Sequence, residues 1–88
     1  MNDIDRLRDL ALSETGFLFD PYSGATFSLN PTAVTILRAL RGSADRVAVL
    51  ETLKREFDVQ SADLEHDLDE FIALLRREGL VSREFGLS

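Results

Sequence analysis

The sequence predicts an α+β fold of winged-helix-like order, in which a three-stranded antiparallel sheet is followed by a three-helix bundle. Short alternating segments separated by Gly and Pro occupy residues 9–29. Three longer segments with apolar residues at helical spacing occupy most of the remaining chain. Strands grouped before helices are typical of α+β domains, whereas strands that alternate with helices build parallel sheets.

The first two predicted strands are short. The segment LALS, residues 10–13, is the first, and GFLFD, residues 16–20, contains the second. Phe17 and Phe19 share one face of that strand, because side chains alternate between faces. We interpret these two side chains and Phe27 as core residues that follow the strand period. The alternative is an exposed aromatic contact surface.

A turn joins the second predicted strand to the third. In the turn DPYSG, Pro21 presets φ and Gly24 can adopt a positive φ. The segment ATFSL then alternates as a half-buried strand does. Its inward residues are Ala25, Phe27 and Leu29, and its outward residues are Thr26 and Ser28.

The first two predicted helices have clear limits. Asn30 can cap free backbone N–H groups, and Pro31 suits the first helical position. Gly42 ends this helix. Its apolar stripe consists of Ala33, Ile36, Leu37 and Leu40. The second helix begins near residues 43–46 and has Leu53 on its buried side.

The third predicted helix is the longest. Ser61 is its expected N-cap, and Gly79 is suited to a left-handed C′ position. Leu80 and Leu75 would then form the hydrophobic pair of a Schellman motif. One further short strand is predicted over residues 81–85.

Length and composition indicate one small domain. The 88 residues divide into an N-terminal arm (1–8), a folded domain (9–81) and a C-terminal tail (82–88). The chain has no cysteine, which excludes disulfides and thiolate metal sites. No apolar run approaches the roughly 18 residues of a membrane helix, and the charged N-terminus does not resemble a secretory signal. We therefore expect a cytoplasmic protein without a membrane partner.

The net charge of −6 is concentrated in one segment. Residues 58–70 carry six acids and no Lys or Arg, which equals the whole acidic excess. Such a surface repels phosphates, so nucleic acid is not an expected partner. The alternative interpretation is a solvated helix face with acids near its positive N-terminal end.

No residue pattern indicates catalysis. His66 is the only histidine, and it lies beside a helical stripe of Asp63, Asp67 and Glu70. A metal site built on carboxylate oxygens is the alternative to a surface histidine, which we favour because no second His or Cys completes a site. No Ser has an oriented base, and no glycine-rich phosphate loop is present. We expect no cofactor, no metal and no enzyme activity.

Three runs, FSLNPTAVTILRAL, VLETLKREFDV and LEHDLDEFIALLRREGLV, resemble the PqqD family. These are small peptide chaperones, whose fold is also called the RiPP recognition element after ribosomally made, post-translationally modified peptides. The resemblance covers roughly residues 9–81 and rests on order and spacing, on NPT at a helix start and on the closing GLV. Ala33 stands where many members have Gly. The segment SETGFLFDPYSGATFSLNPTA most resembles the PqqD-like subgroup of HPr-rel-A systems, which accompanies a kinase related to HPr kinase.

The resemblance implies a non-catalytic adaptor. In such proteins the leader of a precursor peptide adds as an antiparallel strand to the third strand, lies in the groove beside the third helix and is presented to a modifying enzyme. An HPr kinase-related protein would be one such partner. The peptide-binding residues implied here are Ala25, Thr26, Phe27, Ser28, Leu29, Asp63, Asp67, Phe71 and Leu74. A leader that carries Lys or Arg would be steered toward the acidic segment.

Three alternatives stay open. Winged-helix order also permits DNA binding, although the N-terminal half of the third helix carries five acids and no base. The chain could instead be a protein–protein docking module that binds no leader. An exposed third strand could also pair with its own copy in a homodimer.

Overall fold

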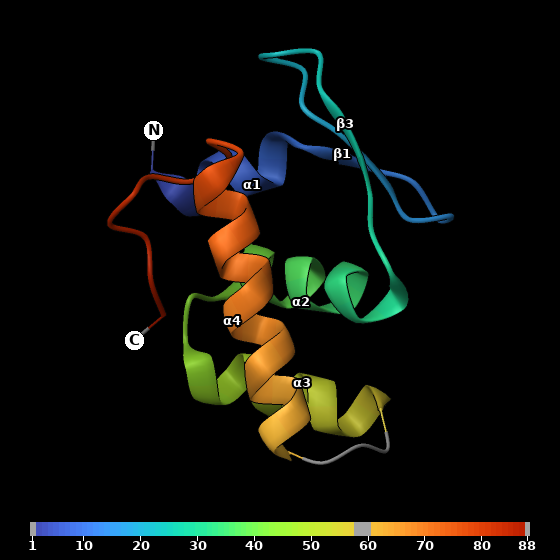
Figure 1. The fold of residues 1–88 in the computed structure, drawn as a ribbon, viewed down its shortest axis with the longest axis vertical. Coiled ribbons are helices and arrows are strands. Elements are labelled where there is room, and N and C mark those ends of the chain that lie inside the picture. The colour runs from blue at the N-terminus through green and yellow to red at the C-terminus, as the bar shows by residue number, and fades with distance from the viewer. Residues whose placement is uncertain (1, 58–60, 88) are drawn as a thin grey trace.

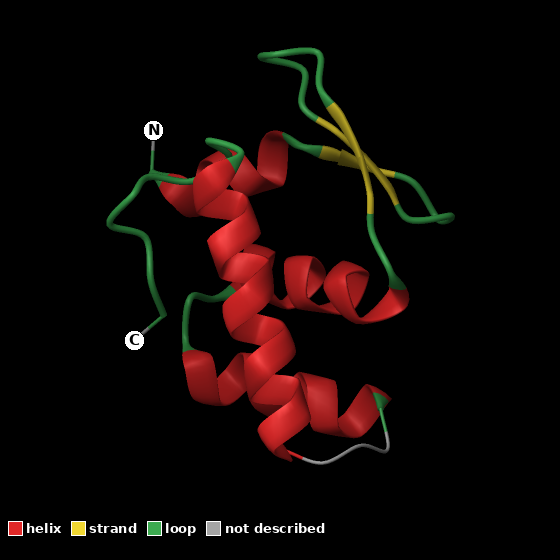
Figure 2. Cartoon of the chain, viewed as in Figure 1, coloured by secondary structure: helices red, strands yellow, loops and turns green. Residues whose placement is uncertain are grey.

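The computed structural model describes residues 2–57 and 61–87. The predicted α+β order is confirmed, because a three-stranded antiparallel sheet precedes three helices (Figures 1 and 2). A further helix, α1, precedes the sheet. In chain order the elements are α1 (Asp3–Asp9), β1 (Ala11–Leu12), β2 (Phe17–Phe19), β3 (Thr26–Ser28), α2 (Pro31–Gly42), α3 (Arg46–Glu56) and α4 (Ser61–Arg77).

Helix α1 occupies the segment that we described only as an arm. Asn2 caps it by accepting the N–H of Asp5 through Oδ1 at 2.8 Å. Ile4, Leu7 and Leu10 recur every three residues and pack against the core, where Leu7 is fully buried. Charged residues lie between these apolar residues, and the helix has only seven residues. The helical spacing is therefore difficult to recognise from the sequence.

The register of the sheet decides which aromatic side chains are buried. Leu18 of β2 pairs with Leu12 on one side and with Phe27 on the other, and its side chain is 1% exposed. Phe27 packs against the core as predicted. The interpretation of Phe17 and Phe19 as core was wrong, because they lie on the opposite face and are 59% and 41% exposed. Strand alternation shows which residues share a face but does not show which face meets the helices.

The predicted starts of the first two helices of the bundle agree with the structure. Asn30 caps α2 by accepting the N–H of Ala33 at 2.8 Å, and Pro31 is the first helical residue. Asp45 caps α3 by accepting the N–H of Val47 at 3.1 Å. These local signals fix where the chain leaves the sheet and enters the bundle.

The end of α4 is a complete Schellman motif, as predicted. The N–H of Leu80 donates to the carbonyl of Leu75 at 2.9 Å, and the N–H of Gly79 donates to that of Arg76 at 3.2 Å. Gly79 has φ +73°. The predicted N-cap role of the Ser61 side chain lies outside what the structure describes.

The strand predicted over residues 81–85 is wrong. The segment forms turns, and its apolar side chains are buried against the helices, with Phe85 7% exposed. Arg76 donates through Nε to the carbonyl of Phe85 at 2.8 Å, and the N–H of Ser82 donates to Asp3 at 2.8 Å. These contacts from α4 and α1 use backbone groups that a strand would need for pairing. None of the helices within residues 2–57 and 61–87 combines the length and the apolar character that a membrane span requires.

Asp20 connects the β2–β3 hairpin to α1. Its carboxylate is 2% exposed and accepts the Ser23 hydroxyl at 2.8 Å, the Tyr22 N–H at 3.0 Å and Arg6 Nη2 at 2.9 Å. Burial raises the pKa of Asp20, but these hydrogen bonds and the charge of Arg6 more than offset burial and hold the pKa below its usual value. Arg6 also lies 4.8 Å from the centre of the Tyr22 ring. The hairpin is therefore fixed relative to the helices.

Gly16 makes a close backbone approach at the end of β3. Its φ is +91°, and an added Cβ would lie 2.6 Å from the carbonyl oxygen of Leu29. We expect Gly16→Ala to lower the free energy of unfolding by about 2 to 3 kcal/mol, because overlap adds to left-handed strain. Gly24→Ala is the matched control: φ is +79° with nothing within 4 Å of the added Cβ, so strain alone would cost about 1 kcal/mol. Equal losses in urea denaturation would contradict the role of the close approach.

Candidate functional site

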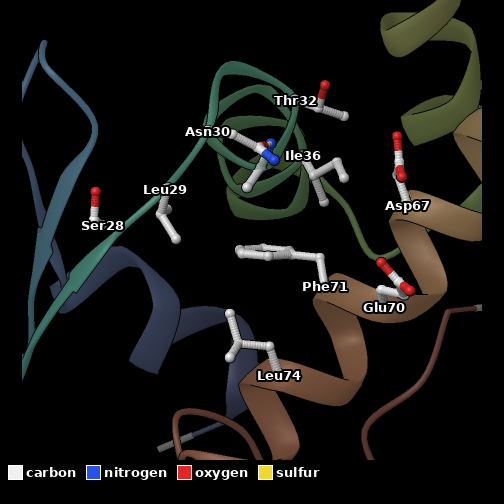
Figure 3. Close-up of a pocket in the computed structure, with 10 residues that line it drawn as sticks. Ser28, Leu29, Asn30, Thr32, Ile36, Asp67, Glu70, Phe71 and Leu74 are labelled. Atoms are coloured by element: carbon white, nitrogen blue, oxygen red, sulfur yellow. Dashed lines mark hydrogen bonds between the residues drawn. The ribbon is translucent and has the colours of Figure 1, made fainter.

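A groove of about 240 Å³ lies where β3, α2 and α4 meet (Figure 3). Its floor is apolar: the Phe71 ring extends toward Leu29, and Ile36 lies beside it. Two carboxylates, Asp67 and Glu70, lie toward one end. The lining residues are Ser28, Leu29, Asn30, Thr32, Ala33, Ile36, Asp67, Glu70, Phe71 and Leu74.

The groove brings together residues predicted on two separate elements. From β3 and the residue after it come Ser28 and Leu29, and from α4 come Asp67, Phe71 and Leu74. The other predicted site residues lie outside this lining. Ala25, Thr26 and Phe27 lie earlier along the β2–β3 hairpin, and Asp63 lies one helical turn before Asp67.

The first turns of α2 form a wall of the groove that sequence reasoning missed. Asn30 was assigned only a capping role, and Ile36 only a place in a buried stripe. Both also line the groove, together with Thr32 and Ala33. Glu70 also lines the groove; it was not among the predicted peptide-binding residues, although the sequence places it in one helical stripe with Asp63 and Asp67. That spacing was the available signal for Glu70.

One edge of β3 has no partner strand in the described part of the chain. The sheet order is β1-β2-β3, so β3 is an edge strand that pairs only with β2. The opposite edge presents backbone N–H and C=O groups beside the groove. This is the geometry that a further strand requires.

The hydrogen bonds of the hairpin show which groups of β3 point outward. The N–H of Asp20 donates to Ala25 at 2.9 Å, and the N–H of Leu29 donates to Gly16 at 2.8 Å. Hydrogen-bonded pairs alternate along an antiparallel ladder, so Phe27 is the β3 residue whose backbone groups face β2. The backbone N–H and C=O groups of Thr26 and Ser28 therefore point away from β2.

Four of the five acids of α4 divide into two sets. Arg46 of α3 lies 2.9 Å from Asp69 and 3.8 Å from Glu65, and the hydrogen bond that Arg46 donates to Asp69 raises the pKa of the Arg46 guanidinium. On the groove side, the described part of the chain places no Lys or Arg nitrogen within 4.0 Å of Asp67 or Glu70. The negative charges on the groove side of α4 are therefore less neutralised than those on the side that faces α3.

His66 has the surface position that we expected. It is 71% exposed, and its Nε2 lies 3.0 Å from Oε1 of Glu70. Within residues 2–57 and 61–87 no three His, Cys, Asp or Glu side chains are grouped so that they could hold a metal ion. The pair is a contact along one helix face between residues four positions apart.

The fold and the groove define a class of small α+β domains in which an edge strand borders a helix-walled groove. Within that class the chain belongs to the PqqD family: the family model described as coenzyme PQQ synthesis protein D (PqqD) matches residues 15–81, more than half of the chain. Membership implies a general role as a non-catalytic chaperone that binds the precursor of a ribosomally made, modified peptide and that has modifying enzymes as partners. No significant match to a curated protein or to a solved structure was found.

Proposed function

We propose that this protein binds the leader segment of a precursor peptide by strand addition to β3 and presents it to a modifying enzyme. The observation that carries the proposal is the open edge of Thr26 and Ser28 beside the groove of β3, α2 and α4. An added strand would satisfy the outward backbone groups largely without regard to its sequence. Backbone hydrogen bonds between β3 and the peptide would then supply affinity, and contacts of the peptide side chains would select among peptide sequences.

The same geometry indicates how the groove would read the peptide. Side chains directly opposite each other in an antiparallel pair lie on the same face of the sheet. Peptide residues opposite Phe27 and Leu29 would therefore point toward the helices, as these two residues do. There they would meet Phe71 and Leu74. Every second leader residue would be selected by the groove, and the residues between would face outward to a modifying enzyme.

Titration of the labelled protein with the leader of a precursor encoded near its gene tests this function by NMR. We expect micromolar or tighter affinity and amide shifts over residues 25–29 and 63–75, because the added strand contacts β3 and α4. Shifts confined to α2 and α3 would exclude the proposed site. A scrambled leader of the same composition is the control for nonspecific binding.

One observation favours a second candidate function, docking on a partner protein without leader binding. Phe17 and Phe19 are 59% and 41% exposed on the outer face of the sheet, away from the groove. Exposed aromatic side chains on one face are typical of protein contact surfaces. The subgroup resemblance makes an HPr kinase-related protein the partner to test. Shifts confined to β2 on addition of that protein, with none from any leader, would favour docking alone.

A further inference from the structure

Two acidic groups of α4, Asp67 and Glu70, line the groove and have no ion pair with Lys or Arg in the described part of the chain. Glu65 and Asp69 lie on the side toward α3, where Arg46 neutralises them. Asp67 and Glu70 line the groove, and their described neighbours within 4.0 Å include no Lys or Arg nitrogen. A basic side chain from a ligand would complement them at low cost, since no existing ion pair with Lys or Arg has to break.

The direction of the elements gives the groove two distinct ends. β3 and α4 run in roughly opposite directions across it (Figures 1 and 3). Asp67 and Glu70 lie at the end near Thr32, whereas Leu74 lies toward the opposite end. A strand antiparallel to β3 runs in the same direction as α4. Its N-terminal part would therefore lie beside the carboxylates and its C-terminal part beside Leu74.

Helical and strand dimensions then set the spacing between two groove-facing peptide residues. The pair Asp67 and Glu70 precedes the pair Phe71 and Leu74 by four residues on average, which is about 6 Å along a helix. Two residues of a strand span about 6.8 Å and place both side chains on one face. A spacing of two residues therefore fits the separation of the acidic and apolar parts.

We infer that the groove selects leader segments in which Lys or Arg precedes a large apolar residue by two positions. The basic side chain lies beside Asp67 and Glu70, and the apolar side chain lies on Phe71 and Leu74. This inference rests on the proposed function, because strand addition to β3 fixes both the direction and the face of the peptide. It adds the chemistry and the order of the residues that are recognised.

A displayed library of random twelve-residue peptides tests the inference on the intact protein. We expect peptides with the basic residue first to be enriched over peptides with the reverse order by about 1.4- to fivefold, the range of one exposed ion pair. The double substitution Asp67→Asn and Glu70→Gln should remove this preference. Glu65→Gln with Asp69→Asn removes as many charges from the side of α4 that faces Arg46 and should preserve it.

The outcomes separate this inference from the function on which it rests. Peptides that bind without preference for order or charge, and that shift the amides of Thr26 and Ser28 in NMR, would overturn only the selection rule. A preference that survives in the Asp67 and Glu70 double variant would overturn it as well. If the library yields no peptide that shifts Thr26, Ser28 or groove residues, both the selection rule and strand addition are excluded.

Discussion

Thr26→Pro is expected to weaken leader binding at least tenfold while the domain stays folded. The N–H of Thr26 points away from β2, so proline removes a donor that an added strand would use. The proline ring would also project into the space that the added strand needs. Edge strands tolerate proline because no existing ladder bond is lost. Thr26 lies outside the lining of the groove, so the change leaves the groove itself unaltered. Calorimetric titration measures the loss, and circular dichroism checks the fold.

Two further variants distinguish lost binding from lost structure. Thr26→Val keeps the backbone N–H and the branched shape, so it should bind as the parent protein does. Phe27→Pro removes an N–H that faces β2 and should destabilise the hairpin. Unchanged affinity in a folded Thr26→Pro protein would contradict strand addition. If the free edge pairs with a second copy, sedimentation analysis would show that Thr26→Pro also shifts dimer to monomer.

The parts of the fold that were predictable depend on local chemistry. Asn30-Pro31 at the start of α2 and Gly79 at the end of α4 are recognisable because caps use residues next to one another in sequence. The order of sheet and bundle follows from the change in hydrophobic period. These signals do not require knowledge of what each element packs against.

The parts that were missed depend on tertiary packing. Alternation grouped Phe17 with Phe19 correctly, but the helices pack on the face that carries Leu18. Phe85 ends a turn rather than forming part of a strand, because its N–H donates to the carbonyl of Ser82 and its own carbonyl accepts from Arg76 of α4. In each case the residue types allow either outcome, and the position of a distant helix decides between them.

The candidate site was predictable on the two elements that the family resemblance identifies. Ser28 and Leu29 at the strand and Phe71 on the helix do converge. The wall formed by α2 was missed because Ile36 already had a structural explanation, and one residue can serve both roles. The pairing of Asp69 with Arg46 could not be inferred either, because the two lie on different helices. It is this pairing that makes the two sides of α4 electrostatically different.

Leu75→Ala is expected to lower the free energy of unfolding by about 2 to 5 kcal/mol, because its side chain is fully buried between the helices and truncation leaves a cavity. That is a large share of the roughly 5 to 10 kcal/mol that stabilises a domain of this size. Its neighbour Leu74 lines the groove and is half-buried. Leu74→Ala should therefore cost less than about 2 kcal/mol of stability, yet weaken leader binding about five- to tenfold. Urea denaturation and calorimetric titration measure the two quantities on each variant.

This pair of adjacent leucines separates the two tasks of α4. Leu75 faces the bundle, so Leu75→Met, which nearly conserves volume, should recover most of the lost stability. Leu74 contributes apolar surface to a ligand instead, so Leu74→Met should recover binding, whereas Leu74→Asp should not. If Leu74→Ala destabilised the domain as much as Leu75→Ala, weaker binding would report only unfolding. If neither Leu74 variant changed affinity in a folded protein, the peptide would have to lie elsewhere than between β3 and α4.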